Sequence, residues 1–296
     1  MALEIVSIKD LILDDEHNKV RIRYEEDDYL KLEKTRVFKS TFDSIGLKNA
    51  VFSSCNINNS IFKNCYLRYA KFNNIDFTGT KFENCDLLNA EFNSCNIRYV
   101  KFMNCQLNLK QMMSCLPHET NLKIALLKEL RMNQLSIGDN KSADEILIKI
   151  HDNEKLLLLE RVKCETSYHK KREDFFSRIN AYFNYIFLTL NDIVWGYGLR
   201  LSRLFRTGLV MIVFMALIIF LFTDEEYMTM TLAGTQLVKL DFWQSVYVSY
   251  TNFINIGYGN YIPVTKKTTI IFGIENLLGF IYLGFLVSGV YRRIAK

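Results

Sequence analysis

Residues 51–85 read VFSSC-NINNS-IFKNC-YLRYA-KFNNI-DFTGT-KFENC, with a large apolar residue second in each group of five and a mostly small one fifth. This period fits neither the helix, with 3.6 residues per turn, nor the strand, with two. The chain must therefore turn a corner once per repeat to keep both positions inside. The large position continues without a break through Phe42, Leu47, Phe52, Ile57, Phe62, Leu67, Phe72, Phe77, Phe82, Leu87, Phe92, Ile97, Phe102 and Leu107.

The same period explains the cysteines. The chain has seven, and five of them occupy the small position of the repeat. An odd count with no C-x-x-C pair argues against a disulfide framework or a zinc site. We expect small, buried apolar side chains in a reducing compartment. The five in the repeat are Cys55, Cys65, Cys85, Cys95 and Cys105, and Cys115 and Cys164 follow it.

This pattern resembles the pentapeptide-repeat family. The resemblance implies a right-handed quadrilateral β-helix over residues 36–112, and this length predicts about three and a half coils that need caps. Residues 1–35 are expected to form the N-terminal cap, because Val20, Ile22 and Tyr24 alternate with charged residues as in a strand. Residues 36–110 hold ten Lys or Arg against five Asp or Glu, so mimicry of DNA is not expected. A rigid spacer or an assembly surface for an unknown cytoplasmic partner is the default function.

The next two segments follow helical spacing. Residues 113–175 predict a helical hairpin, with a break at 136–140 and a capping box formed by Ser142 and Glu145. Residues 176–203 predict a helix along the inner leaflet, because their apolar run contains polar residues and has basic clusters on both sides. We expect the Gly-Tyr-Gly at 196–198 to form a turn rather than a filter.

Residues 204–296 have the composition of a membrane domain. The first predicted span, 204–223, follows Arg200, Arg203 and Arg206, and the second, 268–291, precedes Arg292 and Arg293. This distribution of basic residues predicts that both termini are cytoplasmic and that the protein lies in the inner (plasma) membrane. No leader is visible in the first fifteen residues, so we expect the N-terminal part to stay in the cytoplasm.

Between the spans lies a segment that is too short and polar to cross. It opens with Asp241-Phe242-Trp243 and reaches the run Asn255-Ile256-Gly257-Tyr258-Gly259 before Pro263. It resembles the pore loop of the potassium-channel superfamily, and the whole chain looks like a bacterial group in which pentapeptide repeats precede such a pore. The resemblance implies a pore helix at 242–253, an extended filter at 255–259 with carbonyl oxygens on the axis, and a homotetramer in the lipid bilayer.

The filter departs from the superfamily pattern at two positions. Asn255 stands where Thr is usual at the inner end, and Asn260 stands where Asp usually follows the filter. The first replaces a hydroxyl with a carboxamide that also presents a donor, and the second removes carboxylates from the outer mouth. Two alternatives therefore stay open, a potassium channel and a weakly selective channel for monovalent cations.

Three further residues are assigned supporting roles. Glu275 is an ionisable residue inside the second span, and we expect it behind the pore helix, bonded to Thr251 or to a backbone group that supports the filter. Gly279 lies where pore domains commonly carry a bending glycine, but close helix packing explains a glycine there equally well.

Enzyme activity is not expected. The histidines, His17, His118, His151 and His169, are scattered over polar segments without a nucleophile, metal or phosphate-binding pattern. No cofactor is expected apart from the permeant cation, and no nucleic acid. A gating signal would enter through the N-terminal part. The competing interpretation is a membrane-anchored scaffold, which would tolerate Gly257→Ala, whereas a filter would not.

Overall fold

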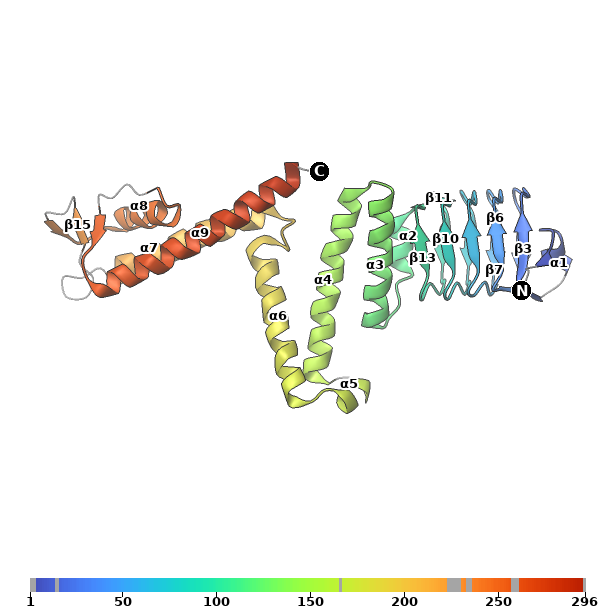
Figure 1. Cartoon of the computed structure of the whole chain (residues 1–296), viewed down its shortest axis with the longest axis horizontal. Coiled ribbons are helices and arrows are strands. Elements are labelled where there is room, and N and C mark those ends of the chain that lie inside the picture. Colours follow the sequence, from blue (N-terminus) through green and yellow to red (C-terminus); the bar gives the residue numbers. More distant parts are fainter. Residues whose placement is uncertain are drawn as a thin grey trace. The chain divides into compact units, whose positions relative to one another are not determined.

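The computed structural model describes residues 4–13, 16–164, 167–222, 230–232, 236–256 and 261–294. The chain divides into two compact units, residues 1–185 and 186–296. The first unit contains a β-solenoid of about five turns followed by helices, and the second contains helices and a small sheet (Figure 1).

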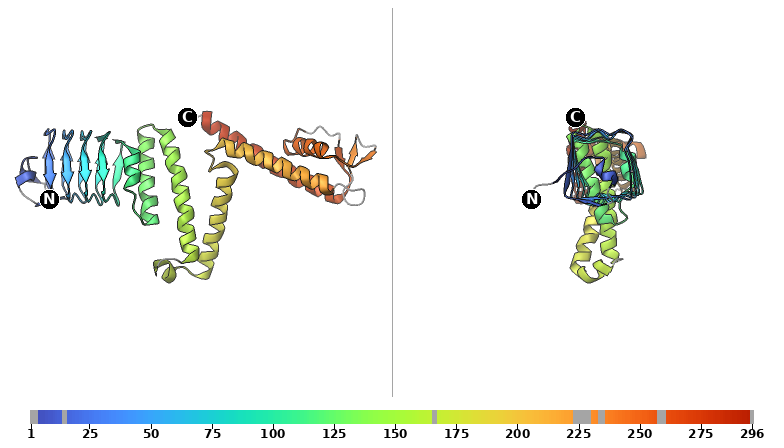
Figure 2. Two further views of the ribbon diagram at one scale, coloured as in Figure 1. Left: turned by 180° about the vertical axis from the view of Figure 1, so that it is seen from behind. Right: turned by 90° about the vertical axis from the view of Figure 1, so that its right-hand side faces the viewer.

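The solenoid is built from short parallel strands whose register is 20 residues, as four five-residue sides per coil require. Phe42 pairs with Phe62, and Phe82 pairs with Phe102. Viewed along its axis the solenoid has a square section (Figure 2). One face holds β1 (Glu4–Ile5), β3 (Val20–Arg23), β6 (Thr41–Asp43), β8 (Ile61–Lys63), β10 (Lys81–Glu83) and β13 (Lys101–Met103). A second face holds β4 (Lys31–Glu33), β7 (Val51–Ser53), β9 (Lys71–Asn73) and β12 (Glu91–Asn93). Two shorter sheets complete the solenoid. One pairs β2 (Glu16–Asn18) with β5 (Arg36–Phe38), and the other pairs β11 (Asp86–Leu87) with β14 (Gln106–Leu107).

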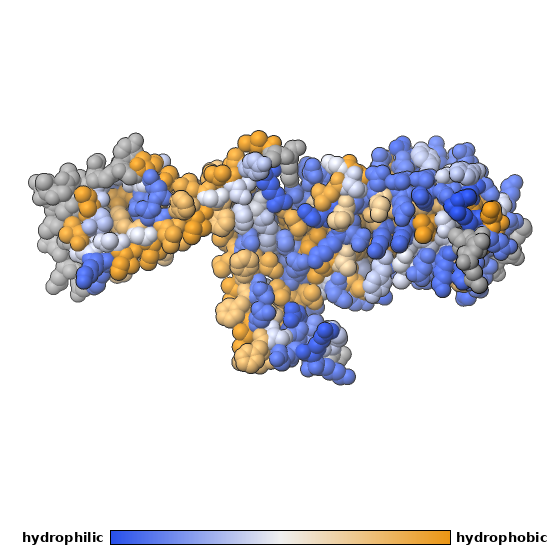
Figure 3. Space-filling view, in the orientation of Figure 1, coloured by the Kyte–Doolittle hydropathy of each residue, from blue (hydrophilic) through white to orange (hydrophobic). Residues whose placement is uncertain are grey.

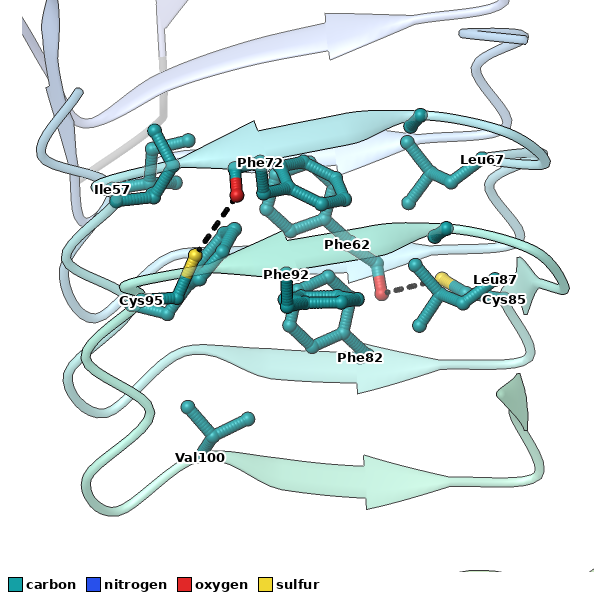
Figure 4. Close-up of a cluster of buried hydrophobic side chains, with 14 of the residues drawn as sticks. Ile57, Phe62, Leu67, Phe72, Phe82, Cys85, Leu87, Phe92, Cys95 and Val100 are labelled. Carbon is teal, nitrogen blue, oxygen red and sulfur yellow. Dashed lines mark hydrogen bonds between the residues drawn. The ribbon is translucent and has the colours of Figure 1, made fainter. Parts of the chain in front are cut away.

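Both inward positions of the repeat are buried, as the sequence predicts. Phe42, Phe62 and Phe82 form one stack of rings, with centroids 4.3 and 5.0 Å apart. Figure 4 shows this core, together with the thiols of Cys85 and Cys95, which donate to the carbonyls of Phe62 and Phe72 at 3.3 and 3.2 Å. Burial raises the pKa of Cys95 to about 11. The cysteines of the repeat are buried core residues without disulfides, as expected.

The solenoid begins earlier than residue 36, so the predicted cap is wrong for much of its length. β3 and β4 pair with β6 and β7 in the same 20-residue register, and Ile22 and Leu32 are buried at the large position. On the other two sides of this first coil, the large position is occupied by His17 and Asp27. Because both residues are polar, the sequence does not show the period of apolar residues there. The N-terminal end is covered instead by β1 and α1 (Asp10–Leu13), from which Leu11 is fully buried.

The C-terminal end of the solenoid is covered by α2 (Leu109–Ser114) and α3 (Thr120–Ser136). The buried Asn133 side chain accepts a hydrogen bond from the Cys105 amide and donates one to the Cys105 carbonyl, both at 2.8 Å. These are groups that a further coil would bind, so one asparagine satisfies both backbone groups of Cys105 in the last coil.

Asn133→Leu is expected to expose the last coil to solvent. The variant leaves the buried amide and carbonyl of Cys105 without partners, and each such group costs about 1–3 kcal/mol. Faster amide hydrogen exchange at Cys105 in the full-length protein measures the effect. Met132→Ala is the matched control, because this neighbouring side chain is exposed. Equal exchange in both variants would contradict the capping role.

The helical middle contains more elements than the predicted hairpin. α3 packs against α4 (Asn140–Lys163), and α5 (Ser167–Arg172) follows. The N-cap of α4 is Asp139, not Ser142: its carboxylate accepts from the Ser142 amide at 3.1 Å. Hydrogen bonds from Ser142 hold the pKa of Asp139 below its ordinary value. The prediction chose the wrong capping residue because Asp139 and Ser142 are both good helix caps.

α6 (Phe175–Trp195) ends eight residues before the predicted boundary at 203. Gly196, Tyr197 and Gly198 all adopt positive φ, so the expected turn is present, and α7 (Leu201–Phe222) begins directly after it. The second unit continues with β15 (Met230–Leu232), β16 (Gln236–Val238), α8 (Phe242–Phe253), β17 (Tyr261–Pro263) and α9 (Lys266–Ile294). The three strands form an antiparallel sheet that the sequence analysis did not anticipate.

Candidate functional site

The candidate site is the short helix α8, which occupies the predicted residues 242–253 and packs against both α7 and α9. Its start is defined by a complete capping box. The Asp241 carboxylate accepts from the Gln244 amide at 2.7 Å, and the Gln244 side chain accepts from the Asp241 amide at 3.0 Å. An apolar cluster joins the three helices and the segment before α8, and it consists of Ile219, Leu240, Val248 and Phe272.

α7 and α9 are long and apolar enough to cross a membrane, with 22 and 29 residues. α7 begins three residues before the predicted span of 204–223 and ends at Phe222, and α9 extends beyond the predicted span of 268–291 at both ends. Figure 3 shows apolar side chains along their surfaces. Leu209, Leu221, Leu277 and Phe280 are among the exposed ones. This composition is compatible with a membrane anchor, and by itself it defines no pore.

A buried polar group lies where α8 meets α9. Glu275 is completely buried, and its carboxyl oxygens lie 2.5 Å from the Ser249 hydroxyl and 2.8 Å from the Asn252 amide nitrogen. The Ser249 hydroxyl also bonds the Ile212 carbonyl on α7 at 2.9 Å. The Asn252 amide also donates to the Phe272 carbonyl on α9 at 3.1 Å. All three helices are therefore joined by one hydrogen-bonded cluster, named here the Glu275 cluster.

Glu275 lies against α8, the helix at the predicted residues 242–253, and its side-chain partners are Ser249 and Asn252 rather than Thr251. The Thr251 hydroxyl instead donates within α8, to the carbonyls of Tyr247 and Val248, both at 3.0 Å. Sequence reasoning missed Ser249 and Asn252. Their spacing of three residues was the available signal, because such residues share one helix face.

Gly279 is a close-packing position in this structure. A Cβ built on it would collide with the backbone carbonyl of Phe253, the last residue of α8. This geometry supports the close-packing alternative, because α9 can lie this near α8 only without a side chain at residue 279. The hinge stays a prediction. Gly284, five residues further on, has open space around it.

The chain leaves α8 through a turn. Asn255 has φ of 60°, and its amide donates to the Asn252 carbonyl at 3.1 Å. This differs from the extended backbone expected from residue 255 onward. Asparagine tolerates this left-handed conformation better than most residues, which is a physical reason for Asn at this position. Ile256 is exposed, whereas Gly257, Tyr258, Gly259 and Asn260 lie outside the described residues.

A cavity of about 410 Å³ lies beside this turn. Its lining includes Thr251, Asn252, Asn255, Thr269 and Asn276, and it presents hydroxyl and amide groups against the apolar ring of Phe272. On the far side of residues 257–260, β17 pairs antiparallel with β15, so that Ile262 lies opposite Thr231. In the chain, the predicted filter therefore follows α8 and precedes a strand of this sheet.

The last turn of α6 is linked to both α7 and α9. Arg203 on α7 forms an ion pair with Asp192, and its guanidinium also donates to the Asp192 carbonyl at 2.7 Å. The Trp195 ring packs on Phe285 of α9, with centroids 4.6 Å apart. The end of α6 thus contacts both apolar helices.

α6 itself is amphipathic. Phe176, Phe183, Phe187 and Leu190 are exposed on one side, while Asn184, Asn191 and Asp192 lie on another. Figure 3 shows apolar side chains on the exposed side of this helix. This is the surface that a helix at a lipid interface presents.

Comparison with known proteins identifies the first unit. Residues 29–92 match the sequence model of a family described as Pentapeptide repeat region. No curated protein sequence matches the chain. Two solved structures of trypsin-treated QnrB1, described as a plasmid-mediated fluoroquinolone resistance protein, align at 21% and 20% identity, with TM-scores of 0.17 and 0.13. Each alignment covers 30% of this chain and about half of QnrB1, 55% and 56%. The chain contains a pentapeptide-repeat domain.

Proposed function

We propose that four copies of this chain form a cation channel of the inner (plasma) membrane, with both termini in the cytoplasm. Potassium is the proposed permeant ion. The observation that carries the proposal is α8. A helix of 12 residues with its own capping box packs between two apolar helices, and the run 255–259 follows it directly. Such a helix is too short to cross a membrane, and irregular backbone at membrane depth needs a protein-lined or water-lined path.

In the proposed mechanism, the backbone carbonyls of residues 255–258 replace the hydration shell of the ion. The carboxyl end of α8 contributes the negative end of its dipole toward the cation. Gly257 and Gly259 permit the dihedral angles that align successive carbonyls. One chain supplies one wall, so the axis needs a homotetramer. The permeant ion is the only cofactor, and the chain performs no catalysis.

The second candidate is a weakly selective monovalent cation channel. The turn at Asn255 favours it, because a left-handed residue at the inner end changes the direction of the first carbonyl. The carboxamide also places an NH₂ donor near the path, which repels cations.

The pentapeptide-repeat domain is proposed to regulate or assemble the pore, together with a cytoplasmic partner whose identity stays open. The contacts of α6 with α7 and α9 support a connection through the interfacial helix, because movement of its last turn would act on both apolar helices through Arg203 and Trp195.

The test is the reversal potential of the purified protein in a planar bilayer, with potassium on one side and sodium on the other. Reversal near the potassium equilibrium value is expected, and Asn255→Thr should keep it there or move it closer. Gly257→Ala is expected to abolish the current, whereas Gly284→Ala, which adds the same methyl group at a position of α9 with open space around it, should leave the reversal potential unchanged. Reversal near zero would favour the weakly selective channel. Equal currents in the wild type and Gly257→Ala would overturn the filter, and no current in either protein would leave a membrane-anchored scaffold.

A further inference from the structure

The Glu275 cluster contains too few hydrogens for an ionised carboxylate. The Asn252 amide has two hydrogens, and its two acceptors are the Phe272 carbonyl and one oxygen of Glu275. Ser249 has one hydrogen, but its hydroxyl lies 2.9 Å from the Ile212 carbonyl and 2.5 Å from the other oxygen of Glu275. One of these two contacts would lack a hydrogen if Glu275 carried none.

A proton on Glu275 completes the count. The protonated oxygen donates to the Ser249 oxygen, and Ser249 then donates to the Ile212 carbonyl. The second Glu275 oxygen accepts from Asn252. Every hydrogen in the cluster then has one acceptor. The bonds from Glu275 through Ser249 to Ile212 run from α9 through α8 to α7, and Asn252 on α8 donates both of its hydrogens to α9.

The surroundings agree with a neutral group. Glu275 and Ser249 have no exposed surface, and within the described residues no Lys or Arg forms an ion pair with Glu275. An unpaired charge inside a membrane-spanning segment is expensive, whereas a neutral carboxylic acid with satisfied hydrogen bonds is tolerated.

We propose that Glu275 is a neutral carboxylic acid that acts as a hydrogen-bond donor and positions the carboxyl end of α8. Asn252, which it holds, lies three residues before Asn255, the first residue of the proposed filter. Glu275 is therefore a positioning residue, because it acts on the ion path through α8. The inference deepens the proposed function and rests on it only for the electrical readout.

The first arm of the test needs no current. Infrared spectra are recorded for the full-length wild type and E275Q in lipid vesicles in heavy water near neutral pH. The difference spectrum is expected to show loss of the carbonyl stretch of a protonated carboxylic acid. E145Q is the matched control, because Glu145 is exposed on α4. This substitution should remove only a carboxylate band. Loss of a carboxylate band in E275Q would overturn the inference.

The second arm is the reversal potential. E275Q keeps the cluster intact, because its amide nitrogen donates to Ser249 and its oxygen accepts from Asn252, so the wild-type value is expected. E275L has similar volume without hydrogen bonds, and a shift of the reversal potential toward zero is expected. An equal shift in E275Q and E275L would overturn the donor role. Loss of the acid band in E275Q, combined with no current in the wild type, would refute the channel and retain the neutral carboxyl.

Discussion

Phe62→Ala is expected to destabilise the solenoid by about 3–5 kcal/mol, the usual cost of deleting a fully buried aromatic ring. The Phe62 ring has no exposed surface and stacks between Phe42 and Phe82. Removing it opens a cavity in the middle coil and weakens the contacts with the coils on both sides. Because each coil of a solenoid touches only its neighbours, this loss divides the stack into two shorter pieces.

Amide hydrogen exchange in the full-length protein measures this effect where it occurs, since exchange reports the local free energy of opening. Faster exchange is expected in β6, β8 and β10. Lys63→Ala provides the control, because the adjacent side chain points outward and is exposed, and a surface change of this kind stays within about 0.5 kcal/mol. Exchange rates in Phe62→Ala close to those of Lys63→Ala would refute the stacked core as the source of stability.

Gly279→Ala is expected to disrupt the packing of α8 on α9. Overpacking of this kind costs about 1–3 kcal/mol and more when backbone must move. Here the added Cβ meets the Phe253 carbonyl, a backbone atom at the end of a helix that is tied down by the Glu275 cluster. Separation of the two helices would stretch the bond between Asn252 and Glu275 and displace the residues that follow α8.

Thermal unfolding of the detergent-purified protein tests this expectation, with Gly284→Ala as the matched control. Both substitutions add one methyl group to α9, but Gly284 faces open space. A lower unfolding temperature and loss of current in Gly279→Ala alone support close packing. If Gly279→Ala keeps the wild-type unfolding temperature but changes the opening of the channel, residue 279 instead serves as a hinge.

Patterns that are local in the chain were predictable. The period of five determines which side chains lie inside the solenoid, because each side of the square has the same length and the same two inward positions. The resemblance to a pore loop predicted the bounds of α8, and its start is a local feature, since the capping box of Asp241 and Gln244 is a contact between residues three apart. The turn at 196–198 followed from two glycines, which adopt positive φ at little cost.

Other features depend on which surfaces meet. The first coil escaped detection because His17 and Asp27 occupy positions that neighbouring coils fill with apolar residues, and only strand pairing reveals the shared register. Asn133 reads as an ordinary helical residue until α3 is placed against the last coil. The pairing of β17 with β15 joins segments about 30 residues apart, and neither carries a strong strand pattern.

The sequence by itself determined a pentapeptide-repeat solenoid, the two long apolar helices and the short helix between them, because period, hydropathy and capping are properties of neighbouring residues. The tertiary structure alone decided the partners of Glu275 and the contact at Gly279. Both depend on the rotation of α9 about its axis relative to α8, and that rotation is the outcome of packing across all three helices rather than of any local pattern.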